Sequence, residues 1–130
     1  MKVTPIDPPR VFDVGHGQKI ELKDCAHIEL APDEQVTFMT GSGAEYDVVR
    51  KTWGYYAAPS LNGRLKRFGL RAVLVKGPDS KYYLLLVEQG REAAFHHYLD
   101  MEGLRILCWL DTEANLKALE QKGSGPKDEG

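Results

Sequence analysis

Basic and aromatic side chains gather between Tyr46 and Arg71. This stretch holds six Lys or Arg residues and one acid, a local charge of +5, which leaves −7 on the rest of a chain whose net charge is −2. Guanidinium groups match the geometry of phosphate and carboxylate, and flat aromatic rings stack on sugars and bases. We therefore predict a binding face for an anionic ligand, such as a phosphorylated sugar or nucleotide sugar, formed by Trp53, Tyr55, Tyr56, Arg64, Lys66 and Arg71.

The same stretch also has a simpler interpretation. The aromatic side chains would then be core residues, and the cations would form a solvated strand face that protects a sheet edge from aggregation. Gly54 interrupts the apolar pattern and Pro59 cannot donate to a strand ladder, so this region is expected at an edge or rim. Aromatic residues at a rim are more often exposed, which favours the binding face without excluding the alternative.

A second group of chemically active residues lies on one predicted strand. Cys25, His27 and Glu29 alternate along it with the spacing of three metal ligands, but no second ligand set accompanies them. We accordingly predict no metal and no cofactor. His16, between two glycines, is an accessible candidate for a general base. The competing enzyme hypothesis is a metal-independent isomerase or epimerase that uses His16 or His27 together with a tyrosine.

The size and composition limit the class of protein. A chain of 130 residues, 42% of them hydrophobic, suits one domain with an ordinary core. A net charge of −2 argues against coating of nucleic acid or membrane surfaces. No apolar run approaches the roughly 18 residues that span a bilayer, and residues 1–9 lack a secretory signal. We expect a cytoplasmic location, with Cys25 and Cys108 unpaired.

The hydrophobic periodicity predicts a β-rich α+β domain. Residues 19–30 alternate between an apolar and a polar face, which is typical of a half-buried antiparallel strand, and Asp24 on the apolar face indicates a bulge or two shorter strands. Asn62-Gly63 is typical of a type I′ hairpin turn. Residues 70–76 and 82–88, apolar on both faces, are predicted as central strands joined by a hairpin.

Helical spacing begins only after these strands. Residues 91–102 are predicted to form a helix that ends at Gly103, and a strand over 104–110 leads to a short C-terminal helix capped by Asp111 or Thr112. We therefore expect a mostly antiparallel sheet in a single domain over 1–123, with an extended arm at 1–9 and a flexible tail at 124–130.

Part of this order resembles a cupin barrel. Residues 28–34 form a strand and a Pro32 turn, another strand follows, and Gly41-Ser42-Gly43 returns the chain to a further strand and a rim loop. The similarity covers residues 19–76. It implies, as an alternative architecture, an all-β barrel with appended helices and a small-molecule pocket, with sugar-nucleotide modification among the family's uses. The metal-binding H-x-H pair of cupins is missing here, so the implied pocket is free of metal.

A third hypothesis concerns the predicted rim. Exposed aromatic residues also pack well between subunits, so the chain is alternatively a homodimeric structural or interaction protein in which the rim meets a second copy.

Overall fold

The computed structural model describes residues 1–17, 19–57 and 59–123; the predicted tail at 124–130 lies outside this part of the chain. The described residues form eight strands and three helices. In chain order these are β1 (Lys2–Val14), β2 (Ile20–Glu29), β3 (Gln35–Met39), β4 (Glu45–Lys51), β5 (Gly54–Tyr56), α1 (Arg64–Arg67), β6 (Leu70–Lys76), β7 (Tyr82–Glu88), α2 (Glu92–Glu102), β8 (Arg105–Trp109) and α3 (Glu113–Lys122).

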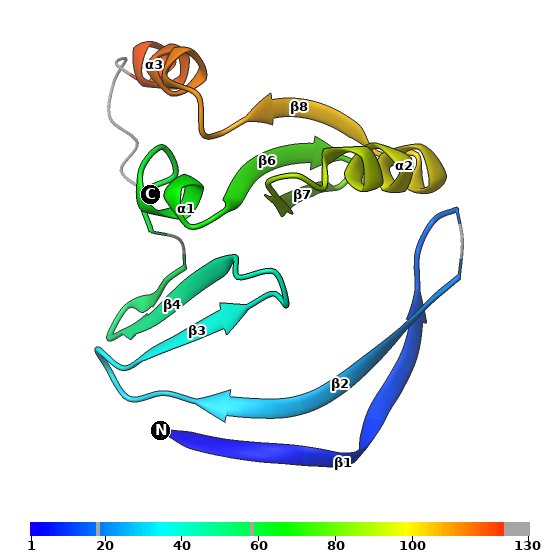
Figure 1. Ribbon diagram of the computed structural model, residues 1–130, viewed down its shortest axis with the longest axis vertical. Coiled ribbons are helices and arrows are strands. Elements are labelled where there is room, and N and C mark those ends of the chain that lie inside the picture. Colours follow the sequence, from blue (N-terminus) through cyan, green and yellow to red (C-terminus); the bar gives the residue numbers. More distant parts are fainter. Residues whose placement is uncertain (18, 58, 124–130) are drawn as a thin grey trace.

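The strands form three separate antiparallel sheets, with the orders β1-β2, β3-β4-β5 and β7-β6-β8. Figure 1 shows the β6–β8 sheet with its helices on one side of the molecule and the long β1–β2 hairpin curving along the other. The broad prediction of a β-rich α+β fold is therefore confirmed, whereas the described strands do not close into a barrel. None of the helices in the described ranges has the length and apolar character needed to cross a bilayer.

Strand β6 is the centre of the hydrophobic core. Its two faces are buried in different clusters, because Val73 and Val75 pack with Leu99 of α2, and Leu70 and Ala72 pack with α1. This double burial explains why β6 is apolar at nearly every position.

The neighbouring strand β7 has the predicted bounds but not the predicted position. It lies at the edge of the sheet, and Tyr82 and Leu84 are more than half exposed. The prediction of a central strand was wrong for β7, since an apolar pattern on both faces does not distinguish a covered strand from an edge strand.

The predicted hairpin at Asn62-Gly63 is also wrong. Gly63 has a φ of −127°, whereas a type I′ turn needs a positive φ there, and the chain enters the short helix α1. The Ser60 hydroxyl accepts a hydrogen bond from the Arg64 N–H at 2.8 Å, and Leu65 is fully buried. Burial of Leu65 stabilises a helical turn in place of the hairpin, so Arg64 and Lys66 lie on a helix and not on a strand.

The helix boundaries agree with the predicted capping residues. Helix α2 ends at Gly103, whose φ of +67° is the left-handed conformation favoured by glycine. Helix α3 begins after Thr112, whose hydroxyl accepts a hydrogen bond from the N–H of Asn115 at 3.3 Å.

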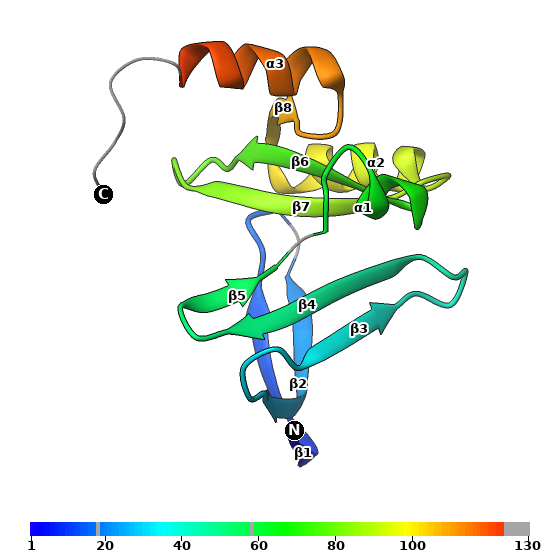
Figure 2. The same ribbon diagram turned by 90° about the vertical axis from the view of Figure 1, so that its left-hand side faces the viewer.

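The β1–β2 hairpin, called the arm below, is the most exposed part of the fold. Figures 1 and 2 show it as a curved ribbon beside the other two sheets. Its register shifts between Pro5 and Arg10, opposite Asp24 and Ala26, which confirms the predicted irregularity but places the extra residues on β1. Residues 2–9, which lie in the N-terminal segment predicted to be extended, form the first part of β1.

The tip of the arm is anchored to the end of α2. The carboxylate of Glu102, only 3% exposed, accepts hydrogen bonds from the N–H groups of His16 at 2.7 Å and Gly17 at 3.1 Å. A Cβ atom at Gly17 would lie 1.5 Å from the carbonyl oxygen of Met101, so only glycine allows this approach. The arm is thereby held to the body at its tip.

Candidate functional site

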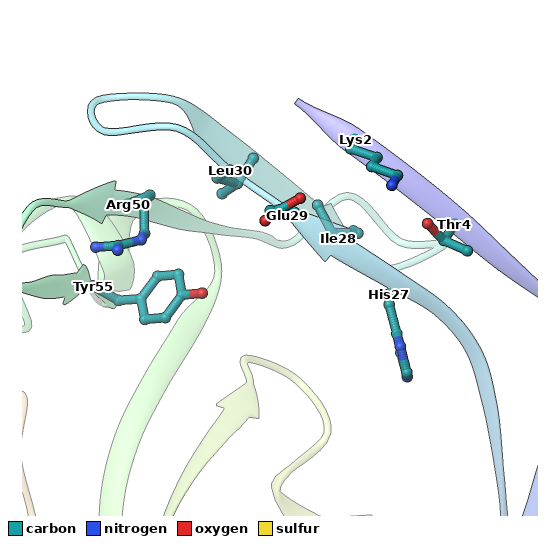
Figure 3. Close-up of a pocket in the computed structure, with 8 residues that line it drawn as sticks. All are labelled: Lys2, Thr4, His27, Ile28, Glu29, Leu30, Arg50 and Tyr55. Atoms are coloured by element: carbon teal, nitrogen blue, oxygen red, sulfur yellow. The ribbon is translucent and has the colours of Figure 1, made fainter.

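A polar pocket of about 450 Å³ lies between the base of the arm and the β4–β5 hairpin. We call it the basic pocket. It combines cations from two sheets with an aromatic ring, and Figure 3 shows its lining side chains: Lys2, Thr4, His27, Ile28, Glu29, Leu30, Arg50 and Tyr55.

Arg50 and Tyr55 form the wall contributed by the β3–β5 sheet. They face each other in the register of β4 and β5, and the Arg50 guanidinium carbon lies 5.7 Å from the centroid of the Tyr55 ring. The Arg50 Nη1 atom donates to the Gly54 carbonyl at 3.0 Å, which fixes the orientation of the guanidinium group. Nη1 of Arg50 thus already donates a hydrogen bond to Gly54. The guanidinium group has further N–H groups with which it can bind an anion.

The arm contributes the opposite wall. Lys2 brings a second cation, Ile28 and Leu30 bring apolar surface, and Glu29 brings a carboxylate. His27 projects from β2 on the side to which the Tyr55 hydroxyl points (Figure 3), and its Nε2 lies 3.2 Å from a carboxylate oxygen of Asp24. The pocket therefore offers both positive charge and hydrogen-bond acceptors.

Arg71, one of the predicted binding residues, is bound within the β6–β8 sheet. Its Nε and Nη2 donate to the two oxygens of Asp111 at 2.7 and 3.1 Å, and the guanidinium carbon lies 4.0 Å from the centroid of the Trp109 ring. The Asp111 side chain is fully buried, and the hydrogen bonds from Arg71 hold its pKa below the ordinary value. This pair joins β6 to the turn before α3.

The two predicted cations on α1 lie near the junction of two sheets. Arg64 donates to Asp47 at 2.9 Å and lies over the Phe68 ring, with 4.5 Å between the guanidinium carbon and the ring centroid. Hydrogen bonds from Thr37 and then from Arg64 lower the pKa of Asp47. Lys66 has an exposed side chain, and its carbonyl accepts a hydrogen bond from the side chain of Gln89.

The three predicted aromatic residues lie at the rim of the β3–β5 sheet. Trp53, in the turn between β4 and β5, is 71% exposed, and Tyr55 and Tyr56 are about half exposed. Of the six predicted residues, Tyr55 lines the basic pocket. The six predicted residues are thus spread over a turn, β5, α1 and β6.

Lys2 and Arg50 of the basic pocket were not selected from the sequence, and Glu29 was considered there only as a metal ligand. Arg50 belongs to the basic stretch, but no turn was predicted between Arg50 and Tyr55, so their pairing across β4 and β5 was not expected. Lys2 and Glu29 are distant from that stretch in sequence. They reach the pocket only because the arm folds back past β4 and β5, which no local pattern indicates.

The two histidines of the enzyme hypothesis each line a cavity that a tyrosine also lines. His27 and Tyr55 line the basic pocket, and His16 lies with Tyr83 and Tyr98 in a second cavity at the arm tip. Within residues 1–17, 19–57 and 59–123, no three His, Cys, Asp or Glu side chains gather as metal ligands would. The two cysteines are free thiols.

The chain matches no family model, no curated protein and no solved structure. Its function is therefore inferred from the geometry of its own residues.

Proposed function

We propose that this protein is a small binding domain whose basic pocket takes a phosphorylated sugar or a nucleotide sugar. The observation that carries the proposal is that Lys2, Arg50 and Tyr55 line one pocket, although they come from two sheets that are far apart in sequence. Two cations suit a phosphate group, and a tyrosine ring suits the flat face of a sugar or base.

The remaining polar groups favour a sugar phosphate over free phosphate. Glu29 would repel an isolated anion, but a carboxylate accepts hydrogen bonds from sugar hydroxyls. Ile28 and Leu30 provide apolar contact for a carbon ring. A volume of about 450 Å³ is within the range of small-molecule pockets.

Calorimetric titration with glucose 6-phosphate, UDP-glucose, inorganic phosphate and glucose tests the proposal. We expect at least one of the two phosphorylated sugars to bind more tightly than phosphate, and uncharged glucose not to bind. Arg50→Gln should weaken the binding by about tenfold to a hundredfold, because a hydrogen bond to a charged group contributes about 1.5–3 kcal/mol.

Lysine variants provide the matched control. Lys2→Gln should weaken binding, whereas Lys19→Gln, at the opposite end of the arm, should not. Equal binding by both lysine variants and wild type, or failure of both phosphorylated sugars to bind, would refute the proposal.

A second candidate function, that of a homodimeric structural or interaction protein, is favoured by the large solvent-accessible surface of the chain. The chain exposes 9313 Å², whereas about 6,900 Å² is typical of a folded monomer of this mass. The seven C-terminal residues outside the described part of the chain can account for at most about 1,000 Å² of the difference. The remaining excess of roughly 1,400 Å² exceeds the ~800 Å² that each partner contributes to a standard interface.

The arm is the surface on which a second copy would pack. Phe12 and Leu22 are paired across β1 and β2, on the same face as Val14 and Ile20, and both are 42% exposed. Sedimentation velocity should show a dimer that Phe12→Asp dissociates. Val11→Asp, on the opposite face of β1, should leave the dimer intact; a wild-type monomer at all concentrations would refute this function.

A further inference from the structure

A second cavity, of about 340 Å³, lies where the arm tip meets β7 and α2. We call it the tip cavity. The arm lines it with Val14, His16 and Ile20, and the body lines it with Tyr83, Tyr98 and Glu102. Its walls thus differ from those of the basic pocket, because apolar and aromatic side chains predominate and no lysine or arginine is among the described residues that line it.

Two carboxylates lie at or beside the tip cavity. Glu102 lies in its wall, and its carboxylate binds the N–H groups of His16 and Gly17. Asp79 lies just behind the wall, where it accepts a hydrogen bond from the Tyr83 hydroxyl and lies 3.5 Å from Nε2 of His16. The Tyr83 bond lowers the pKa of Asp79, so this group is ionised at neutral pH.

Two tyrosine rings strengthen the preference for a cation. Tyr83 and Tyr98 both line the cavity, from β7 and from α2, and a positive charge over such a ring is attracted by its negative face. Apolar walls, two aromatic rings and two carboxylates together suit a molecule that has an apolar body and a positive charge.

From this arrangement we infer that the tip cavity binds a small apolar amine in its protonated form. The ligand's carbon skeleton packs against Val14 and Ile20, and its ammonium group lies near the tyrosine rings and the Glu102 carboxylate. Because the cavity has one wall on the arm and one on the body, the bound amine also holds the arm in its docked position. This site is independent of the anion proposed for the basic pocket.

Three probes that share one ring test the inference at neutral pH: benzylamine, benzyl alcohol and benzoate. Amide chemical-shift mapping should place benzylamine at the tip cavity, with an affinity at least about fivefold higher than that of benzyl alcohol. Benzoate should show no saturable binding there. Saturable benzoate binding of equal strength, benzylamine shifts confined to other surfaces, or no saturable benzylamine binding would each overturn the inference.

Variants test the role of the ring. Tyr98→Leu keeps the apolar contact and removes the aromatic face, so benzylamine should bind at least threefold more weakly while benzyl alcohol changes less than twofold. Tyr82→Leu, on the other face of β7, should leave both affinities unchanged. Ile20→Phe, which fills the cavity from the arm, should abolish binding of both probes. Unchanged benzylamine affinity in both Tyr98→Leu and Ile20→Phe would overturn the assignment.

Discussion

Substitution of Gly17 by alanine should release the arm tip from α2. The new Cβ would lie 1.5 Å from the Met101 carbonyl oxygen and 2.6 Å from its carbon, and both are backbone atoms that cannot rotate away. Relief of this overlap requires the tip to retreat by about 2 Å, to ordinary van der Waals separation. The hydrogen bonds of 2.7 and 3.1 Å from His16 and Gly17 to Glu102 would then lengthen beyond bonding range.

The expected loss of docking free energy follows from those two hydrogen bonds. A hydrogen bond to a charged group contributes about 1.5–3 kcal/mol, so the two bonds contribute about 3–6 kcal/mol before compensation. Water returns to Glu102 once the tip leaves, and the arm regains conformational freedom. A net loss of about 2–4 kcal/mol remains, which raises the ratio of undocked to docked arm by roughly 30-fold to 1,000-fold.

Native-state hydrogen exchange measures this ratio directly. Amide protection at positions 16 and 17 should fall in Gly17→Ala, because these N–H groups bond to Glu102, whereas protection in β6 should change little because its ladder lies in another sheet. Gly41→Ala is the control, since a Cβ atom there meets nothing within 4 Å. Arm protection equal to wild type in Gly17→Ala would refute the docking of the tip on α2.

Three further predictions concern the body of the fold. Asp111→Asn should lower the free energy of unfolding by about 2–4 kcal/mol in urea titrations, because it leaves Arg71 without its charged partner, whereas the exposed Asp33→Asn should cost less than ~1 kcal/mol. Since the pKa of Asp111 is lowered in the native state, its stabilisation is complete above about pH 5 and is lost progressively as the pH falls below ~4, through the lowered native pKa. Urea titrations between pH 2.5 and 7 should show this loss in wild type and less of it in Asp111→Asn. Leu65→Ala should cost about 2–5 kcal/mol, and a value below ~1 kcal/mol would contradict its complete burial.

Features set by near neighbours in the chain could be predicted well. Gly103 ends α2 and Thr112 begins α3, because a glycine in the left-handed conformation and a hydroxyl at an N-cap act within one helical turn. The bounds of β6 and β7 also agree with the apolar runs. Sheet position was not predictable, because β7 lies at the edge only since β8, later in the chain, pairs with β6 and not with β7.

The turn at Asn62-Gly63 shows where local propensity failed. The pair favours a hairpin by itself, but burial of Leu65 and the bond from Arg64 to the Ser60 hydroxyl stabilise a helical turn. Burying a leucine contributes about 1.5–3 kcal/mol, which exceeds typical differences in turn preference. The free energy of burying Leu65 therefore outweighs the preference of Asn62-Gly63 for a hairpin turn.

The excess of positive charge between Tyr46 and Arg71 is a property of the sequence alone, as are the alternating strands and the helix ends. Which of those charges line a pocket was decided by tertiary structure. Arg71 is bound by Asp111, 40 residues away, whereas Arg50 lies in a pocket completed by the arm. The physical reason is that electrostatic and packing energies depend on distance in space, so a charge count identifies cations but not the acids that fold against them.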